Sequence, residues 1–292
     1  MKASVLVWRV KRRVLRLFVQ REVRTDNLVI LCNQRAGSTW LLDTLRAHPA
    51  ISMDESGGFF HYFDLDGSRY PVDLSNQRDD NTQRVEVLPR RYFRVPDFTI
   101  PGFPEHDQCI PQYRIEKVHP EFYRFNTQKF IKKIRAQEQQ GKQFKIILLV
   151  REPLATLQSF YLYQQRNPKW YGWLAEGELV DFMLKTYQSL AEFKASYGGY
   201  LVTYANMFAR PHDVVADIWR ELWDAPGYYD SLQFGRDVEA SIQLTRREER
   251  LKTGTPFLGE EQEEEPTDLP FLGAGTAGKM LELQRLFDRI TA

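Results

Sequence analysis

The stretch 33–40 contains the side chains of this chain that are best suited to holding an anion. Arg35 carries a full positive charge, and Gly37 lets the backbone come close to a bound group. The two hydroxyl residues that follow, Ser38 and Thr39, add hydrogen-bond donors. A helix that begins here presents amides without intrahelical partners at the positive end of its dipole. The pattern therefore predicts a phosphate-binding loop.

A second arginine, Arg151, stands where another helix is expected to begin, and Ser159 follows it eight positions later. Pro153 lies between them at a position that suits the first turn of a helix. The pattern indicates a second anion site. Two alternatives stay open, because Arg151 can instead pair with Glu152 and a serine inside a helix is common.

Both arginines follow apolar runs that are typical of strands buried on both faces of a parallel sheet. The runs cover residues 29–32 and 144–150, and residues 200–204 resemble a third strand. Helical spacing or boundary residues predict helices after the first two strands and over 122–140, 182–197, 214–222 and the C-terminal end. The sequence thus predicts an α/β fold of the P-loop type, with three layers and a central, mostly parallel sheet flanked by helices.

The first loop differs from the loop of nucleotide triphosphatases, which has the pattern Gly-x-x-x-x-Gly-Lys-Ser/Thr. Here one glycine is present instead of two, and no lysine precedes Ser38. The stretch 34–40 instead resembles the 5'-phosphosulfate loop of sulfotransferases that use the donor 3'-phosphoadenosine 5'-phosphosulfate (PAPS), with Gln34 and Ala36 as departures. The pair Arg151 and Ser159 resembles the 3'-phosphate motif of the same family, with glutamate in place of aspartate after the arginine.

The resemblance covers about residues 27–204 and is nearest to bacterial carbohydrate sulfotransferases of the trehalose type. It implies transfer of a sulfuryl group from PAPS to a hydroxyl of a carbohydrate or glycolipid, with the product PAP and without a metal. It also implies that Trp40 stacks on the adenine, while Tyr204 occupies the family's Tyr-Glu-Asp position with Ala-Asn after it. The residues that the resemblance assigns to the donor are Arg35, Ala36, Gly37, Ser38, Thr39, Trp40, Arg151, Ser159 and Tyr204. A nucleotide kinase or triphosphatase, or a relative that only binds a nucleotide or lipid, remains the alternative.

The acceptor hydroxyl needs a general base. Glu55 matches the glutamate of the bacterial carbohydrate enzymes and lies sixteen residues beyond Thr39, so the loop after Pro49 is able to fold back over the helix start. His61 is the second candidate. A surface carboxylate and a histidine in an aromatic cluster are the corresponding structural interpretations, and an unrecognised residue is the third possibility.

Composition places this chain among globular proteins, with 42% hydrophobic and 27% charged residues and a net charge of +1. This balance argues against a general nucleic-acid binder. Only two cysteines occur, Cys32 and Cys109, which favours a reducing, cytoplasmic location. No apolar run approaches the roughly 18 residues that cross a bilayer. We expect one domain over 25–292, and the sequence leaves its oligomeric state open.

Three further segments carry expectations. Residues 1–24 form a cationic amphipathic helix that either packs on the domain or lies on the inner face of a membrane. The aromatic-rich stretch of about 50–115 is interpreted as an insertion that binds the acceptor. The glycine-rich stretch 272–280 is either a linker or a loop that closes over the nucleotide.

Overall fold

The computed structural model describes residues 26–46, 51–52, 113–120, 125–141, 143–166, 178–222, 232–253, 269–273 and 275–292. The expected N-terminal helix and most of the expected insertion lie outside these ranges. Within them, no helix is both long enough and apolar enough to cross a membrane.

Five parallel strands form the central sheet, in the spatial order β2-β3-β1-β4-β5. Strand β1 pairs with β3 on one side and with β4 on the other, with Leu31 opposite Val118 and Leu148. The carboxyl ends of β3, β1 and β4 are therefore neighbours at one edge of the sheet. In chain order the strands are Asp26–Cys32 (β1), Ile51–Ser52 (β2), Tyr113–Val118 (β3), Phe144–Val150 (β4) and Tyr200–Thr203 (β5).

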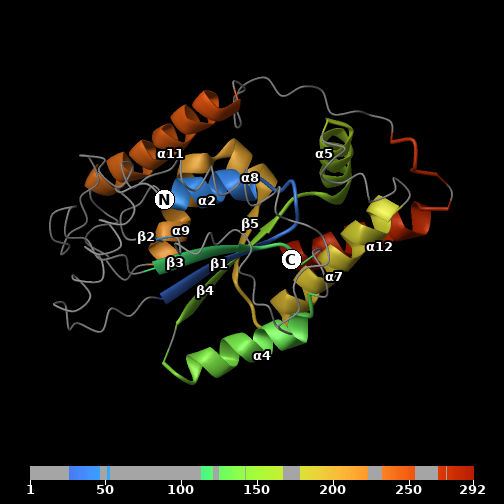
Figure 1. Cartoon of the computed structure of the whole chain (residues 1–292), viewed down its shortest axis with the longest axis horizontal. Helices are drawn as coiled ribbons and strands as arrows, with labels where there is room; N and C mark the ends of the chain where they lie inside the picture. The colour runs from blue at the N-terminus through green and yellow to red at the C-terminus, as the bar shows by residue number, and fades with distance from the viewer. Residues whose placement is uncertain are drawn as a thin grey trace, which may run out of the picture.

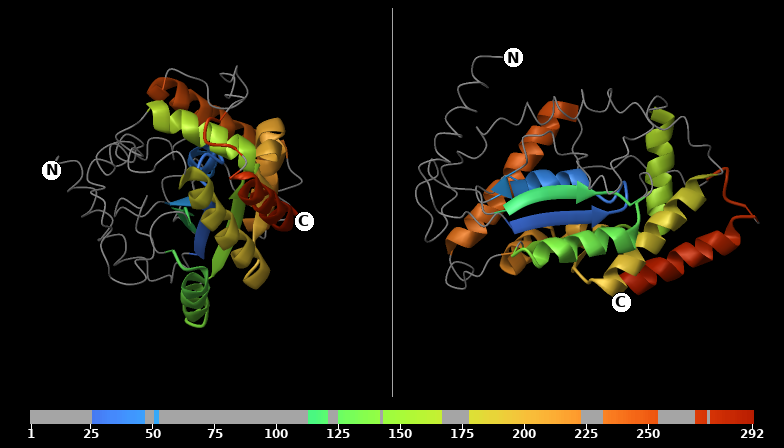
Figure 2. Two further views of the ribbon diagram at one scale, coloured as in Figure 1. Left: turned by 90° about the vertical axis from the view of Figure 1, so that its right-hand side faces the viewer. Right: turned by 60° about the horizontal axis from the view of Figure 1, so that its bottom comes forward.

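Helices cover both faces of this sheet, as Figures 1 and 2 show. Four of the described helices, α2, α8, α9 and α11, lie on one side, and α4, α7 and α12 lie on the other. The helices are Ser38–Arg46 (α2), Thr127–Glu138 (α4), Pro153–Arg166 (α5), Leu179–Ser196 (α7), Tyr204–Ala209 (α8), Pro211–Leu222 (α9), Leu232–Thr253 (α11) and Ala277–Thr291 (α12).

The alternation of side chains along the strands produces the two cores. In β1, Leu28 and Ile30 pack in the cluster that contains Trp40 of α2, whereas Val29 and Leu31 pack in the cluster of α4, α5, α7 and α12. Successive side chains of a strand point to opposite faces, so a run buried on both faces reads as continuously apolar. The predicted α/β fold class is confirmed.

Four elements were not predicted from the sequence: β2, β3, α8 and α11. Strand β3 begins inside the stretch 50–115 that was interpreted as an acceptor-binding insertion. It was not predicted because its sequence YRIEKV mixes charged and apolar residues. The charged residues 246–250 belong to the long helix α11. The third strand ends one residue earlier than predicted, because Thr203 accepts a hydrogen bond from the Asn206 amide at 3.2 Å and starts α8.

Candidate anion-binding site

The two predicted loops lie side by side at the carboxyl edge of the sheet. We call residues 33–37, between β1 and α2, the Arg35 loop, and residues 151–152, between β4 and α5, the Arg151 turn. The strands that precede them, β1 and β4, are hydrogen-bonded neighbours, and β3 flanks β1 on its other side. The connection from β3 to β4 passes over β1, because β3 and β4 lie on opposite sides of that strand. Parallel α/β sheets bind ligands at the carboxyl ends of the strands beside such a crossover.

The backbone of the Arg35 loop adopts a tight left-handed shape before α2 begins. Arg35 has φ +62° and Gly37 has φ +78°, and the Gly37 carbonyl accepts the Leu41 amide at 3.1 Å. A Cβ atom on Gly37 would lie 2.5 Å from Met207 Cε and 3.2 Å from the Tyr204 ring. Glycine is therefore favoured here by its conformation, and a Cβ atom would also press on the flexible end of the Met207 side chain and on the Tyr204 ring.

The side chain of Arg35 contacts α5 at two points. Its Nε donates to Ser159 Oγ at 3.2 Å, and its guanidinium carbon lies 4.5 Å above the centre of the Tyr163 ring. Ser159 is 9% exposed. The predicted partner of Arg151 in sequence therefore lies in hydrogen-bond contact with the arginine of the other motif.

Arg151 completes the connection between the two motifs. Its Nη1 donates to the Arg35 carbonyl at 3.2 Å, and its guanidinium carbon lies 4.3 Å above the centre of the Tyr204 ring. The residue is 7% exposed. The Arg151 side chain thus contacts the backbone of the Arg35 loop, and the Arg35 side chain contacts α5, so the two motifs are in direct contact. Two arginines so connected suit a ligand with more than one phosphate.

Glu152 neutralises the start of α5. Its carboxylate accepts the amides of Leu154 at 3.0 Å and Ala155 at 2.7 Å. A capping carboxylate satisfies first-turn amides and interacts favourably with the helix dipole. The Arg151 turn therefore offers a ligand its side chains rather than the amides that Glu152 occupies.

Two residues at the end of β3, Lys117 and His119, were missed by the sequence analysis. Lys117 is 8% exposed and its Nζ donates to Thr39 Oγ1 at 3.1 Å, so a neighbouring strand brings an ammonium group to the first turn of α2. His119 Nδ1 lies 3.2 Å from the Cys32 carbonyl and 3.5 Å from Cys32 Sγ. The available signal was a lysine and a histidine two positions apart, at the end of a stretch that mixes charged and apolar residues.

The protonation state of His119 follows from this environment. Burial lowers its pKa well below the usual value of 6.5, the Lys117 charge lowers it further, and the hydrogen bond to the Cys32 carbonyl acts in the opposite direction. A carbonyl oxygen only accepts, so the contact with the Cys32 carbonyl places the proton of the neutral imidazole on Nδ1. The lowered pKa favours the neutral form of the imidazole.

The remaining predicted residues have varied locations. Ala36 and Trp40 are fully buried, and Ser38 is 6% exposed at the start of α2. The buried indole of Trp40 packs in the core, so its stacking on an adenine stays a prediction. Glu55 and His61 lie outside the described residues, and their roles also stay predictions.

The glycine-rich stretch near the C-terminus packs against α5 and α7 where it is described. The Phe271 ring lies 5.6 Å from that of Tyr161, and the Thr276 hydroxyl accepts the Gly273 amide at 3.0 Å. Lys279 forms an ion pair with Asp181 at 2.7 Å. These contacts anchor the segment to the domain, and its contact with a nucleotide remains a prediction.

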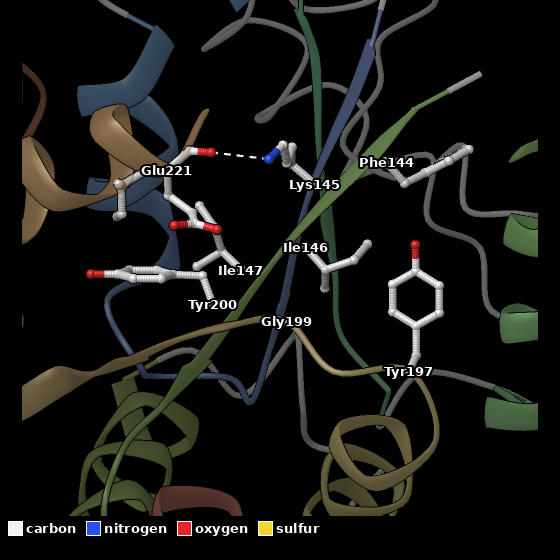
Figure 3. Close-up of a pocket in the computed structure, with 9 residues that line it drawn as sticks. Phe144, Lys145, Ile146, Ile147, Tyr197, Gly199, Tyr200 and Glu221 are labelled. Carbon is white, nitrogen blue, oxygen red and sulfur yellow. Dashed lines mark hydrogen bonds between the residues drawn. The ribbon is translucent and has the colours of Figure 1, made fainter. Parts of the chain in front are cut away.

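A cavity of about 390 Å³ lies elsewhere, at the amino-terminal end of β4. Figure 3 shows Ile147, Tyr200 and Glu221 on one side of the strand and Ile146 and Tyr197 on the other. The strand β4 separates this cavity from the Arg151 turn, because the two lie at its opposite ends. It therefore contributes nothing to the anion site.

Comparisons with known proteins found similarity only at the level of solved structures. No family model and no curated protein sequence matches the chain. The sulfotransferase domain of the Synechococcus PCC 7002 olefin synthase is 16% identical, with 91% of this chain and 95% of that chain covered and a TM-score of 0.47. The sulfotransferase STF9 from Mycobacterium avium is 14% identical, with coverage of 94% and 79% and a TM-score of 0.47.

A third similar structure is a sulfotransferase from Alicyclobacillus acidocaldarius, 14% identical, with coverage of 80% and 97% and a TM-score of 0.43. The function proposed for this chain rests on its own two loops.

Proposed function

We propose that this protein is a PAPS-dependent sulfotransferase. The observation that carries the proposal is the meeting of the two anion motifs: Arg35 Nε lies 3.2 Å from Ser159 Oγ, and Arg151 Nη1 lies 3.2 Å from the Arg35 carbonyl. PAPS carries a 5'-phosphosulfate and a 3'-phosphate on one nucleoside. A single site with two arginines and the start of a helix matches that charge distribution.

The residues divide between the two ends of the donor. The Arg35 loop and the first turn of α2 hold the 5'-phosphosulfate, with Thr39 supported by Lys117. The Arg151 guanidinium and the Ser159 hydroxyl hold the 3'-phosphate. Since Arg35 already contacts Ser159, donor binding exchanges an internal hydrogen bond for charge-assisted bonds to phosphate.

In the reaction, the acceptor oxygen attacks sulfur in line with the bond to the 5'-phosphate oxygen. The new S–O bond forms as the old one breaks, PAP leaves with the electron pair, and the acceptor proton passes to a base. Negative charge grows on the leaving phosphate, where Arg35 and Lys117 stabilise it. Positioning and cationic donors thus supply most of the catalysis, as in phosphoryl transfer, and the proposal requires no metal.

Three named residues are candidates for the base. Glu55 and His61 are the candidates from the sequence, and His119 is the candidate that the geometry adds, since it follows β3 and its Nδ1 lies 3.2 Å from the carbonyl of Cys32, the residue before the Arg35 loop. The proton acceptor must reach the acceptor hydroxyl in the bound complex. Substitution of each candidate in turn decides among them, as described in the Discussion.

The acceptor in this proposal is a hydroxyl of a carbohydrate or glycolipid. The aromatic stretch 50–115 supports it, because aromatic faces with polar neighbours suit sugar rings and lipid chains. Incubation with ³⁵S-labelled PAPS and a panel of sugars, glycolipids, phenols and sterols tests the activity directly. Label transferred to a sugar hydroxyl supports the proposal, and transfer confined to phenols or sterols would reject the acceptor class.

Membrane contact through residues 1–24 is part of the same proposal for a cytoplasmic enzyme. Eight basic residues and interspersed apolar ones suit the surface of an anionic bilayer. Flotation with phosphatidylserine vesicles, with and without residues 1–24, is the test. Equal flotation of both forms would reject the contact.

The rival function, a nucleotide kinase or triphosphatase, predicts a preference for ATP with magnesium over PAP. In the described structure the lysine that reaches the loop comes from β3, whereas the triphosphatase pattern places it inside the loop. Binding of ATP with magnesium in preference to PAP would favour the rival.

A further inference from the structure

A buried hydrogen-bond network joins the two loops beneath the proposed ligand. Its side chains come from the Arg35 loop (Asn33), the first turns of α5 (Thr156) and the middle of α7 (Tyr187), and each is fully buried. Asn33 Nδ2 donates to Thr156 Oγ1 at 3.2 Å, and that oxygen lies 3.2 Å from the Tyr187 hydroxyl. Each hydroxyl has a single proton, which the Thr156 hydroxyl donates to the Glu152 carbonyl and the Tyr187 hydroxyl to the Arg151 carbonyl. The two hydroxyls are therefore in contact, and the hydrogen bonds that connect β1 with α7 pass through the backbone of Arg151.

The backbone amide and the backbone carbonyl of Arg151 each form a hydrogen bond with a side chain of this network. Its amide donates to Asn33 Oδ1 at 3.1 Å, and its carbonyl accepts the Tyr187 hydroxyl. Arg151 follows the last residue of β4, so side chains here replace the partners that a neighbouring strand would supply. Buried backbone groups must be satisfied, and these two bonds hold the peptide planes on either side of the Arg151 Cα atom.

The same network fixes the start of α5 and the position of α7. The Thr156 hydroxyl donates to the Glu152 carbonyl at 2.8 Å. The network therefore forms hydrogen bonds with the backbone of both residues of the turn, Arg151 and Glu152. The Tyr187 ring lies 6.5 Å from that of Phe287 on α12, so the packing of α7 against α12 sets the position of the hydroxyl. Three fully buried side chains thereby determine the position of the Arg151 guanidinium.

We propose that Tyr187, acting with Thr156 and Asn33, is a positioning residue that gives the site its selectivity for a ligand with a second phosphate. This inference rests on the proposed function, in which Arg151 and Ser159 hold the 3'-phosphate. Tyr187 touches no ligand; it orients Arg151 through the backbone carbonyl. Loss of the hydroxyl leaves that carbonyl buried without this donor and lets the Arg151 turn shift relative to Ser159.

The test compares two ligands that differ only in the 3'-phosphate, PAP and adenosine 5'-phosphate, by calorimetry on the full chain. Tyr187→Phe is expected to weaken PAP binding by roughly 10-fold, the scale of one lost buried hydrogen bond, and to change adenosine 5'-phosphate binding by less than about 2-fold. The matched control is Tyr197→Phe, which removes a hydroxyl that donates to Glu138 at 2.7 Å and lies at the other end of the sheet. The control is expected to change neither affinity.

A second pair of variants separates positioning from folding. Thr156→Val removes the central hydroxyl and is expected to reproduce the selective loss, whereas Thr156→Ser keeps the hydroxyl and is expected to restore PAP binding. If Tyr187→Phe fails to fold, as judged by thermal unfolding, the Thr156 pair decides the outcome.

Two results would overturn the inference while the proposed function stands. One is a wild-type preference for PAP that Tyr187→Phe and Thr156→Val leave unchanged, and the other is an equal loss for both ligands. A wild-type protein that binds PAP no better than adenosine 5'-phosphate would overturn the proposed function together with the inference.

Discussion

The Arg35 loop and the Arg151 turn have the same arrangement of strand, arginine and helix, but they prepare the helix start in different ways. Helix α2 follows Gly37, and its first turn contains no acidic residue. Helix α5 follows Glu152, whose carboxylate occupies the first amides. A helix start whose first-turn amides are not capped by a side chain can bind an anion through those amides and the helix dipole. A capped helix start binds an anion through side chains alone.

This difference fits the two ends of the proposed donor. Charge develops on the 5'-phosphate during sulfuryl transfer, so a helix start, Arg35 and Lys117 are concentrated there. The 3'-phosphate does not change during the reaction, and two side chains suffice to recognise it. We therefore expect variants of the Arg35 loop to change turnover and variants of the Arg151 turn to change affinity.

The largest effect is expected for Arg35→Ala. Removal of a cation that stabilises the leaving phosphate should lower kcat by roughly 10²–10³-fold. Arg151→Ala should mainly raise the KM for PAPS and the Kd for PAP. The exposed Arg289→Ala on α12 is the control for loss of a positive charge. Steady-state kinetics with labelled PAPS measures the split, and equal kcat losses in both loop variants would contradict the comparison.

Substitution of the base should give the next largest effect. His119→Asn preserves a donor for the Cys32 carbonyl but removes Nε2, and loss of a general base lowers turnover by roughly 10²-fold or more. Glu55→Gln and His61→Asn are the parallel variants. The residue whose substitution lowers kcat while the PAP Kd stays within about 2-fold is the base.

If none of the three lowers turnover, the base belongs to another residue, and His119 then acts as a buried structural histidine. Full activity in His119→Asn would specifically exclude the candidate that the geometry adds.

A smaller effect on stability is expected for Gly37→Ala. The positive φ and the contact with Met207 should together destabilise the fold by about 1–3 kcal/mol, measured by urea unfolding. Adding Met207→Ala removes the side-chain contact but leaves the backbone strain. If the strain dominates, the double variant recovers nothing; a full recovery would show that packing of α8 dominates.

The smallest effect is expected for Glu152→Gln, which makes the Arg151 turn more like the Arg35 loop. Loss of the carboxylate near the anion should tighten PAP binding by a few-fold, about 0.3–1 kcal/mol, and weaken the cap of α5 by a similar amount. The gain should shrink as salt screens the charges. Unchanged or weaker PAP binding at low salt would show that the Glu152 carboxylate does not weaken the binding of PAP.

The sequence was sufficient to predict the parts of the fold that rest on periodicity. Strands β1 and β4 are continuous apolar runs because both faces are buried, and Pro153 marks the start of α5 as predicted. Strand β3 was not predicted because its sequence YRIEKV mixes charged and apolar residues, and one of its buried side chains, Lys117, is charged. A lysine within a strand weakens an apolar pattern even when it points to a function.

The residues of the site that belong to a sequence motif could be predicted. Contacts between residues of different strands and helices could not be predicted. Arg35 and Ser159 are separated by 124 positions and meet at 3.2 Å, a contact that the motifs imply only if both strands are adjacent. The contact between Lys117 and Thr39 has no local signature, because it depends on the position of β3 beside β1. Sequence patterns locate residues on elements, and the strand order decides which of them meet.

The most direct test of the central claim is calorimetry with PAP in the presence of EDTA, on the wild-type protein and on Arg151→Ala. If the two loops form one donor site, the wild type binds PAP at one site per chain without a metal. The variant then loses at least about 10-fold in affinity, as expected for a charge-assisted contact. Binding of PAP that is unchanged in Arg151→Ala, or binding only of ATP with magnesium, would contradict the account.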